Sequence, residues 1–215
     1  CLDALGGNNK VFSTLDLRSG YHQVAMDPRD KEKTSFICHM GSFCFRTMPM
    51  GLVNAGATFQ RLMDIVMSGL LYDIVMSGLL YDKCLVHLDA IIVFSPDYDT
   101  QLENLEAVLR RLMEYGLKLK ASKCKLFQKR VAFLGHIISA DGIETDPEKT
   151  KAIDEWSTPT DVSQTRSFLG TCGYYRRFIK DYAEVSFPLS NLLRKSVRFK
   201  WTAECQHAFE TLKAA

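Results

Sequence analysis

Apolar and polar positions along the first half of the chain predict a series of short β-strands. Residues 11–17 read Val-Phe-Ser-Thr-Leu-Asp-Leu, an apolar strand with an acid close to its end. Residues 36–45 are rich in aromatic and β-favouring side chains around a Met-Gly-Ser centre, which predicts a hairpin. Residues 84–95 form a β-branched apolar run that is interrupted only at 87–90, by His-Leu-Asp-Ala. We therefore expect a strand on each side of that interruption.

Two segments of the same half have the apolar spacing of amphipathic helices. Residues 54–67 repeat apolar side chains three and four positions apart. Residues 102–113 show the same spacing more clearly, and we expect their helix to stop at Gly116, because glycine is the usual residue just beyond a helix end. Residues 125–139 again favour strands and predict a further hairpin.

The pattern becomes helical after Asp141-Gly142. Asp146-Pro147 is a typical helix start and predicts one short helix. Thr160 or Asp161 is expected to cap a second helix. One face of this second helix is expected to carry Phe168, Cys172, Tyr175 and Ile179. We place a domain boundary near residues 139–145.

A nine-residue sequence, Asp-Ile-Val-Met-Ser-Gly-Leu-Leu-Tyr, occurs at 64–72 and again at 73–81. Solenoid repeats are longer, so two identical adjacent copies indicate a slip in the gene or in its assembled coding sequence. Nine helical residues would add roughly 13.5 Å and two and a half turns, which would turn everything downstream to the opposite face. We therefore expect either that the fold loops one copy out or that the strand before Asp89 is displaced.

The composition is that of a folded protein. At 215 residues with 47% hydrophobic side chains, the chain is long enough for one large domain or two small ones, and wholesale disorder is not expected. No apolar run approaches the ~20 residues that a membrane span needs, and no signal peptide is recognisable. Because the first residue is not Met, we expect the chain to be a piece of a longer one.

Cysteine and charge usage narrow the chemistry. None of the seven cysteines forms a C-x-x-C pair, and Cys84 and Cys172 lie inside apolar segments, which favours buried free thiols over a zinc site. The net charge of +2 says little, but basic residues gather in two stretches. They are Lys118, Lys120, Lys123, Lys125, Lys129 and Arg130, and then Arg176, Arg177, Lys180, Arg194, Lys195, Arg198 and Lys200. A phosphate-rich partner and a solvated surface both fit this distribution.

Two acids stand out by their positions. Asp89 lies at a tight turn between apolar strands, where an ionised carboxylate is costly unless a cation or hydrogen-bond donors meet it. Asp16 is a second acid in a similar strand. Acids on neighbouring strands can share Mg²⁺, and two such ions about 4 Å apart would activate a 3′-hydroxyl and stabilise a leaving pyrophosphate. Taken alone, each acid is explained more simply as a turn former or a helix cap.

Longer motifs favour the metal-binding interpretation. Residues 12–23 (FSTLDLRSGYHQ) closely resemble the first polymerase motif of retrotransposon reverse transcriptases, and residues 48–63 (MPMGLVNAGATFQRLM) resemble the second. Residues 85–95 (LVHLDAIIVFS) resemble the strand–turn–strand that carries their Tyr-x-Asp-Asp. Residues 116–127 and 133–139 resemble the later palm motifs and the primer grip. Residues 166–179 resemble the thumb-region helix of gypsy-type LTR retrotransposon polyproteins.

This resemblance covers nearly the whole chain in the right order and implies an α+β fold. The expected architecture is a polymerase palm with an antiparallel sheet and helices, a partial fingers hairpin and a helical thumb. The implied division is palm at 1–23, partial fingers at 24–54, palm with the primer-grip hairpin at 55–140, thumb or connection helices at 141–200, and a truncated start of an RNase H region at 201–215. We expect the first fingers strands to precede residue 1 and no RNase H activity in this chain.

The resemblance also assigns roles to single residues. Asp16 corresponds to the first metal-binding aspartate, with the Leu17 carbonyl as a further ligand, and Asp89 corresponds to the second aspartate. Tyr21 matches the aromatic residue that closes off the sugar 2′ position and so rejects a ribose hydroxyl. A core aromatic is the alternative interpretation of Tyr21.

Further residues match the nucleotide and primer sites of the family. Met50 and Gly51 match the turn that floors the incoming nucleotide. The hairpin that holds the primer end is matched by Leu134, Gly135 and His136. For Lys118 and Lys120, a solvated surface and a catalytic role fit equally well.

The sequence departs from the family at the Tyr-x-Asp-Asp motif, which here reads His87-Leu88-Asp89-Ala90. Ala90 cannot bind metal, so we expect nucleotide–metal binding to survive in part while the chemical step falls steeply. His87 is not expected to compensate, because imidazole is a poor Mg²⁺ ligand. The second motif departs as well, with Gly56 where the family has proline and Val53 where it has a basic residue.

The resemblance implies an RNA-directed DNA polymerase domain of a retrotransposon, catalytically impaired in this copy. The expected cofactor is Mg²⁺ at a two-ion site, one ion being weakened by Ala90. The expected partners are an RNA or DNA template with primer, deoxynucleoside triphosphates, and the rest of a Pol polyprotein with its RNase H and integrase, without a membrane. We expect it in the cytoplasm, in virus-like particles, or in the nucleus. Two alternatives stay open, a non-catalytic nucleic-acid-binding remnant and a decayed pseudogene product that does not fold stably.

Overall fold

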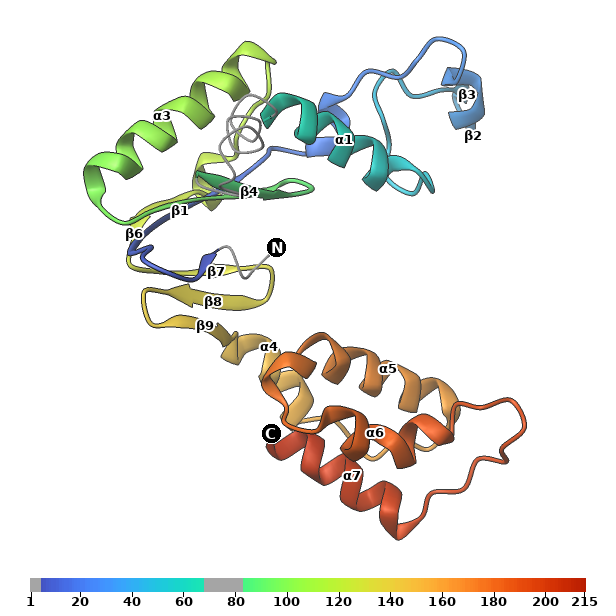
Figure 1. The fold of residues 1–215 in the computed structure, drawn as a ribbon. Helices are drawn as coiled ribbons and strands as arrows, with labels where there is room; N and C mark the ends of the chain where they lie inside the picture. The colour runs from blue at the N-terminus through green and yellow to red at the C-terminus, as the bar shows by residue number, and fades with distance from the viewer. Residues whose placement is uncertain (1–4, 68–82) are drawn as a thin grey trace. The chain divides into compact units, whose positions relative to one another are not determined.

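The chain folds into two compact units. The computed structural model describes residues 5–67 and 83–215. One unit comprises Cys1–Glu144 and the other Thr145–Ala215, and each is described here by itself (Figure 1). Among the described residues, the first unit contains the strands and two long helices, and the second unit is helical apart from Thr145, the last residue of a strand. The predicted α+β class is confirmed.

A four-stranded antiparallel sheet forms the centre of the first unit. Its strand order is β4-β5-β1-β6, so the first strand of the chain lies between strands that follow about 80 and 110 residues later. The strands are β1 (Val11–Asp16), β4 (Cys84–His87), β5 (Ala90–Ser95) and β6 (Lys125–Gln128). The strand on each side of the 87–90 interruption is therefore confirmed, and β4 and β5 pair with each other.

Two helices cover one face of this sheet. They are α1 (Ala55–Met67) and α3 (Tyr98–Glu114), and Figure 1 shows both on the same side of β1 and β4. One apolar cluster contains Leu15 and Ile91 from the sheet together with Phe59 of α1 and Val108 of α3. Alternate residues of the same strands belong to a second cluster on the opposite face, which does not include these helices. The sheet thus has a helix-covered face and a second face.

Local sequence explains where α3 begins and ends. The Asp97 side chain accepts a hydrogen bond from the Thr100 backbone N–H at 2.8 Å, which satisfies one of the free donors of the first turn. The helix ends at Glu114, and Gly116 follows with φ +69°, a conformation that favours glycine. The predicted stop at Gly116 is confirmed, while the helix starts earlier than the apolar spacing indicated.

The residues between β1 and α1 form a small extension. It contains two 3₁₀ turns and a hairpin: η2 (Gly20–Gln23), η3 (Lys31–Thr34), β2 (Phe36–Cys38) and β3 (Gly41–Phe43). The predicted hairpin is confirmed, and Phe36 stacks on Phe43 across the pair with ring centroids 5.9 Å apart.

The predicted hairpin at 125–139 is wrong in its first part. β6 pairs with β1 in the central sheet, and the hairpin is formed by β7 (Arg130–Phe133) and β8 (His136–Ser139). β9 (Gly142–Thr145) completes a separate three-stranded sheet in the order β7-β8-β9. Phe127, with φ +51°, donates its backbone N–H to the buried Ser13 hydroxyl at 3.1 Å. This contact with β1 binds the segment to the central sheet, which a local pattern of strand-favouring residues does not reveal.

The second unit is a small helical bundle. It contains one 3₁₀ turn, η5 (Arg176–Phe178), whereas the 3₁₀ turn η4 (Ala121–Lys123) precedes β6 in the first unit. The bundle helices are α4 (Pro147–Asp154), α5 (Val162–Tyr174), α6 (Tyr182–Asn191) and α7 (Ala203–Ala214). Asp146 caps α4 as predicted, and Asp161, rather than Thr160, caps α5 by accepting from the Gln164 N–H at 2.8 Å.

The expected apolar face of α5 is only partly right. Phe168, Cys172 and Tyr175 all belong to the core of this unit. However, α5 ends at Tyr174, so Tyr175 and Ile179 lie beyond the helix, and η5 changes the direction of the chain between them. The helix stops there because the Tyr175 N–H bonds to Cys172 O at 3.0 Å, which tightens the last turn.

Buried free thiols are found where they were predicted. Cys84 and Cys172 are both buried and unpaired. Burial disfavours the thiolate and raises the pKa of Cys84 to about 12 and that of Cys172 to about 11, so both thiols stay neutral and unreactive.

In the described ranges, no helix combines the length and the apolar character that a membrane crossing requires.

The duplicated sequence does not displace the strand before Asp89. The first four residues of copy one, 64–67, form the last turn of α1, and the remainder of both copies at 68–81 lies outside the described residues. Beyond them, β4 pairs with β5 in continuous register, and β5 pairs with β1 from Val11 to Asp16. The expectation that one copy is looped out also falls outside the described residues.

Deleting residues 73–81 should therefore leave the fold of the first unit intact. The 16 residues between Met67 and Cys84 become seven. Because each doubling of a connection costs only about 0.6 kcal/mol, we expect the free energy of unfolding to change by less than about 1 kcal/mol. Urea unfolding of the deleted and the parent chain measures the change. Loss of the cooperative transition in the deleted chain would contradict this prediction.

Candidate active site

The two acids singled out in the sequence lie next to each other at one end of the central strands. Asp16 is the last residue of β1, and Asp89 is the second residue of the two-residue turn between β4 and β5. The register places Asp16 opposite Ala90, and the Leu17 N–H donates to Asp89 O at 3.1 Å. The Asp16 side chain is 27% exposed, and Asp89 is exposed. Both carboxylates are therefore available to a ligand at this end of the sheet.

Position 90 lies beside Asp16 on the same face of the sheet. Residues that oppose each other in an antiparallel pair point to the same side, with Cβ atoms about 5 Å apart. The pairs Asp16–Ala90 and Ala90–His87 place these three side chains in one row across three strands. Their neighbours Leu15 and Ile91 point to the helix-covered face. The methyl group of Ala90 thus occupies the position from which an acid would face Asp16.

The turn that carries Asp89 is strained. Leu88, its first residue, has φ +54°, a conformation that a side chain other than glycine or asparagine seldom adopts. Such strain persists only where surrounding contacts impose it. The Leu88 N–H donates to Gln60 Oε1 of α1 at 2.8 Å, and Asp89 O accepts from Leu17 N–H. The turn is held from both sides, by α1 and by the residue after β1.

Close packing beneath Asp89 requires a glycine in η2. A Cβ built on Gly20 would lie 2.8 Å from Phe59 Cζ and 3.3 Å from Asp89 Cβ. Tyr21 follows, half-buried, with its ring edge-to-face on Phe59 at 5.3 Å between centroids. Tyr21 therefore packs against the core and still keeps partial exposure beside the acids.

The glycine at the start of α1 leaves room near the same tyrosine. A Cβ on Gly56 would lie 3.6 Å from Tyr21 Oη and 3.9 Å from Leu88 Cδ2, which are ordinary contacts. Gly56 thus marks a small open space between the tyrosine and the strained turn. The exposed Val53, three residues earlier, offers no charge there.

Sequence reasoning missed a lysine at the site. All three lysines Lys118, Lys120 and Lys123 are exposed, and Lys123 Nζ lies 3.2 Å from Asp16 Oδ2. Backbone bonds bring their loop to β1: the Arg18 N–H donates to Lys118 O and the Lys120 N–H to Asp16 O, both at 2.8 Å. Since 107 residues separate the partners of this ion pair, no local pattern indicates it.

The donor atoms present suit a hard divalent cation. The carboxylates of Asp16 and Asp89 are oxygen ligands of the type that Mg²⁺ prefers. The Leu17 side chain is buried and apolar, so the group of this residue that could bind a cation is its backbone carbonyl. Over residues 5–67 and 83–215, however, no three His, Cys, Asp or Glu side chains gather into a metal-binding group. Asp16 and Asp89 are therefore the two carboxylates that this end of the sheet offers within the described residues.

The remaining residues implied by the resemblance lie in two other turns of the first unit. Met50 is 75% exposed and Gly51 has φ +90° in a turn before α1. Leu134 and Gly135 form the two-residue turn between β7 and β8, both with positive φ, as in a type I′ turn. The His136 side chain is only 2% exposed, with Nδ1 at 2.7 Å from Leu134 O, so this ring points into the protein.

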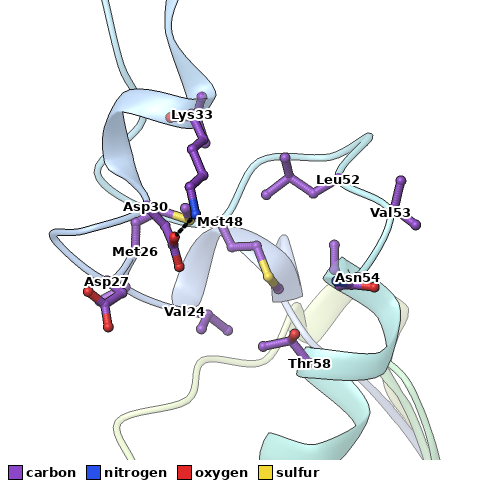
Figure 2. Close-up of a pocket in the computed structure, with 13 residues that line it drawn as sticks. Val24, Met26, Asp27, Asp30, Lys33, Met48, Leu52, Val53, Asn54 and Thr58 are labelled. Carbon is purple, nitrogen blue, oxygen red and sulfur yellow. Dashed lines mark hydrogen bonds and ion pairs between the residues drawn. The ribbon is translucent and has the colours of Figure 1, made fainter.

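The first unit contains a cavity of about 480 Å³ that is separate from the two acids. Figure 2 shows its walls, which come from the residues after η2, from η3 and from the start of α1. The Asp30–Lys33 ion pair, 2.6 Å long, closes one side. The lining residues labelled there are Val24, Met26, Asp27, Asp30, Lys33, Met48, Leu52, Val53, Asn54 and Thr58. Asp16 and Asp89 do not line it.

Comparison with known proteins assigns this arrangement to a class. Residues 2–138 match the profile of the family described as reverse transcriptase (RNA-dependent DNA polymerase), and the chain belongs to this family. More particularly, it is a reverse transcriptase domain of the gypsy type found in LTR retrotransposon Pol polyproteins, as the resemblance of its motifs implied.

The curated relatives are Pol polyproteins of transposons. The chain is 44% identical over 188 residues to the retrovirus-related Pol polyprotein from transposon opus of Drosophila melanogaster, which covers 87% of this chain and 18% of that protein. It is 40% identical over 209 residues to the polyprotein from transposon 297 of the same organism, covering 97% and 19%. The chain thus spans less than a fifth of the length of these relatives.

Solved structures share the fold. The foamy viral protease-reverse transcriptase in complex with double-stranded DNA superposes with a TM-score of 0.82 at 23% identity, over 97% of this chain and 35% of that one. The same viral protein with an RNA/DNA hybrid gives 0.81 at 23% identity, over 99% and 28%. At this level of identity, the likeness establishes the α+β reverse transcriptase fold alone.

Proposed function

We propose that this chain is the RNA-directed DNA polymerase domain of a retrotransposon Pol polyprotein and that Ala90 impairs it catalytically. The observation that carries the proposal is the placement of Asp16, the last residue of β1, beside Asp89 in the β4–β5 turn, with both carboxylates accessible. Neither acid caps a helix and neither lies in the core, so both carboxylates are available to serve nucleotidyl transfer.

Each site residue has a role in the proposed reaction. Bound Mg²⁺ would supply the charge that activates the primer 3′-hydroxyl and stabilises the leaving pyrophosphate. Asp16 and Asp89 would hold it through their carboxylates, with the Leu17 carbonyl as a further ligand. Tyr21 would stand against the sugar and exclude a 2′-hydroxyl, because an apolar ring leaves that hydroxyl unpaired.

The substrates would be held by the outer turns. Met50 and Gly51 would floor the incoming deoxynucleotide, and the exposure of Met50 supports this role. Leu134, Gly135 and His136 would hold the primer end. Because the His136 ring is buried, the contact would come from the backbone of this turn and the imidazole would act as its internal support.

The proposed impairment follows from the row of Asp16, Ala90 and His87 side chains on the sheet face away from α1 and α3. An acid at position 90 would stand about 5 Å from Asp16, measured between Cβ atoms, and would complete a three-carboxylate set. With alanine there, two carboxylates share the charge of the cations. One ion of the two-ion site would be weakened, and the chemical step would slow more than nucleotide binding.

The proposed partners are a template with its primer, deoxynucleoside triphosphates and the rest of the polyprotein. The viral relatives in the superposed structures carry double-stranded DNA or an RNA/DNA hybrid. The basic residues of the second unit are suited to phosphates. In this proposal, the palm comprises residues 1–23 and 55–140, and the partial fingers comprise residues 24–54. The thumb or connection comprises residues 141–200, and the RNase H region begins at 201–215.

Single-nucleotide extension tests the proposal. We expect the chain to add one deoxynucleotide slowly to a primer annealed to an RNA template, in a reaction that requires Mg²⁺. Asp16→Asn should abolish this addition and leave duplex binding unchanged, because it removes a metal ligand without altering the fold. A product that forms equally well with Asp16→Asn would refute a polymerase role.

A second candidate is a non-catalytic nucleic-acid-binding remnant, which the alanine at position 90 favours. This candidate predicts salt-dependent binding of a primer–template duplex, with no extension even after the acid is restored. Filter binding at several salt concentrations, together with extension by the repaired chain, separates the two. A non-cooperative thermal melt would instead indicate the product of a decayed gene.

A further inference from the structure

A side chain of α1 holds the turn that presents Asp89. In a two-residue hairpin, the flanking residues His87 and Ala90 pair with each other, so the ladder leaves the Leu88 N–H without a partner. Gln60 Oε1 accepts this N–H at 2.8 Å from an element 28 residues away. The bond ends on the residue whose φ of +54° is the strained one. Gln60 therefore acts on the conformation that decides where the next side chain, Asp89, points.

The orientation of the Gln60 amide is set by a second residue. Gln60 Nε2 donates to Asp64 Oδ1 at 2.9 Å, one turn further along α1. An ionised carboxylate only accepts hydrogen bonds, so the NH₂ end must face Asp64 and the carbonyl end must face Leu88. The assignment of oxygen and nitrogen thus follows from the chemistry of the partners. Asp64, Gln60 and the Leu88 N–H form a directional relay.

The relay has a counterpart on the other side of the turn. Asp89 O accepts from Leu17 N–H, so β1 fixes the second turn residue while α1 fixes the first. Directly below, Gly20 leaves just enough space for Asp89 Cβ beside the Phe59 ring. Without the Gln60 bond, only the β1 side would restrain a turn that Leu88 strains toward another conformation.

We propose that Gln60 is a positioning residue of the proposed polymerase site, which holds the Leu88–Asp89 turn so that the Asp89 carboxylate meets the cation shared with Asp16, and that Asp64 orients it. This inference rests on the proposed function. It concerns a residue that touches no substrate and acts through the turn. Loss of Gln60 is therefore expected to loosen the Leu88 amide and to weaken the cation site, with little change in the global stability of the unit.

Three variants isolate the relay. Gln60→Met removes the acceptor and keeps an unbranched side chain of similar length. Gln60→Glu keeps an acceptor for Leu88 but places a carboxylate against Asp64. The double variant Gln60→Glu with Asp64→Asn restores a donor–acceptor pair with the roles of charge and amide exchanged.

The chain offers a matched control in the second unit. Gln206 of α7 makes the same kind of contacts: it donates to Glu210 one turn later at 2.8 Å and accepts from Trp201 Nε1 at 2.8 Å. Gln206→Met therefore loses equivalent hydrogen bonds at a distance from the acids in the sequence and in a different unit.

Two measurements on the otherwise natural chain read out the result, and neither needs nucleotide incorporation. We expect Gln60→Met to speed hydrogen–deuterium exchange of the Leu88 amide about tenfold, the effect of one hydrogen bond. We expect it to weaken Mn²⁺ binding, used as a spectroscopic substitute for Mg²⁺, by several-fold. The charge-exchanged double variant should recover both values, and Gln206→Met should change neither.

The outcomes are distinguishable from failure of the proposed function. Unchanged Leu88 exchange in Gln60→Met, or a double variant no better than the single one, overturns the relay while Mn²⁺ binding still depends on Asp16. Mn²⁺ binding that is insensitive to Asp16→Asn and Asp89→Asn overturns the shared cation site, and the positioning role with it. The relay is supported if, among the Gln60 variants, the double variant is the one that recovers both the Leu88 exchange rate and the Mn²⁺ affinity.

Discussion

Replacing Ala90 by aspartate is expected to raise the rate of Mg²⁺-dependent primer extension on the order of a hundredfold. The register opposes position 90 to Asp16, on the face away from α1 and α3. The new carboxylate would thus stand beside the Asp16 carboxylate, with Asp89 as its chain neighbour. The proposed cation site would then have three carboxylates in place of two.

The same substitution should lower stability when no divalent cation is present. Two carboxylates on directly opposed residues repel each other, and one lysine, Lys123, lies 3.2 Å from Asp16 to offset them. Adding Mg²⁺ should reverse the loss, because the cation binds the folded chain and stabilises it by mass action. Thermal melts with and without Mg²⁺ measure this difference.

Ala90→Asn is the matched control for the repair. It has the size of aspartate but no charge, so it should restore neither the extension rate nor the Mg²⁺-dependent gain in melting temperature. Single-turnover extension by the three chains decides the matter. Equal rates for Ala90→Asp and the natural chain would show that the alanine is not what limits catalysis.

Gly20→Ala is expected to destabilise the first unit by about 1–3 kcal/mol and to slow extension in the Ala90→Asp background. The added methyl would lie 2.8 Å from Phe59 Cζ, and Phe59 is fully buried. It would also lie 3.3 Å from Asp89 Cβ. Relief of the clash would therefore move the core ring or the turn that carries the acid, and both moves are costly.

Gly56→Ala provides the contrast for this prediction. Its Cβ would make ordinary contacts of 3.6 and 3.9 Å with Tyr21 Oη and Leu88 Cδ2. Because alanine is favoured over glycine inside a helix, this variant should gain up to about 1 kcal/mol in unfolding free energy. Urea midpoints of both variants test the pair. A Gly20→Ala chain as stable as Gly56→Ala would mean that η2 adjusts more freely than its packing indicates.

Local pattern was enough to predict the kinds and approximate bounds of several elements of the first unit. The strand at 11–17 is β1 to within one residue, and the helix at 54–67 is α1. The strand–turn–strand at 84–95 is β4 and β5, with Asp89 in the turn. These predictions hold because side-chain alternation and helical spacing reflect which face of a single element is buried. The motifs added the family, which the comparisons confirm.

Pairing across the chain was beyond such patterns. The sequence predicted β6 as half of a hairpin, but β6 pairs with β1. Local patterns do not show this pairing, because the two strands are more than 100 residues apart. The ion pair of Lys123 with Asp16 spans 107 residues, and the bond of Gln60 to Leu88 spans 28. The inward direction of the His136 ring was likewise not evident from the residue type.

The amino-acid pattern was thus enough to predict an α+β reverse transcriptase domain with an acid at the end of one strand, another at a turn, and alanine next to the second acid. The tertiary structure was needed to show that Ala90 faces Asp16, that Lys123 rather than Lys118 or Lys120 accompanies that acid, and that Gln60 bonds to the Leu88 N–H. Periodicity is encoded within a few residues, whereas the side chains that meet at a site are chosen by strand register and packing between distant segments.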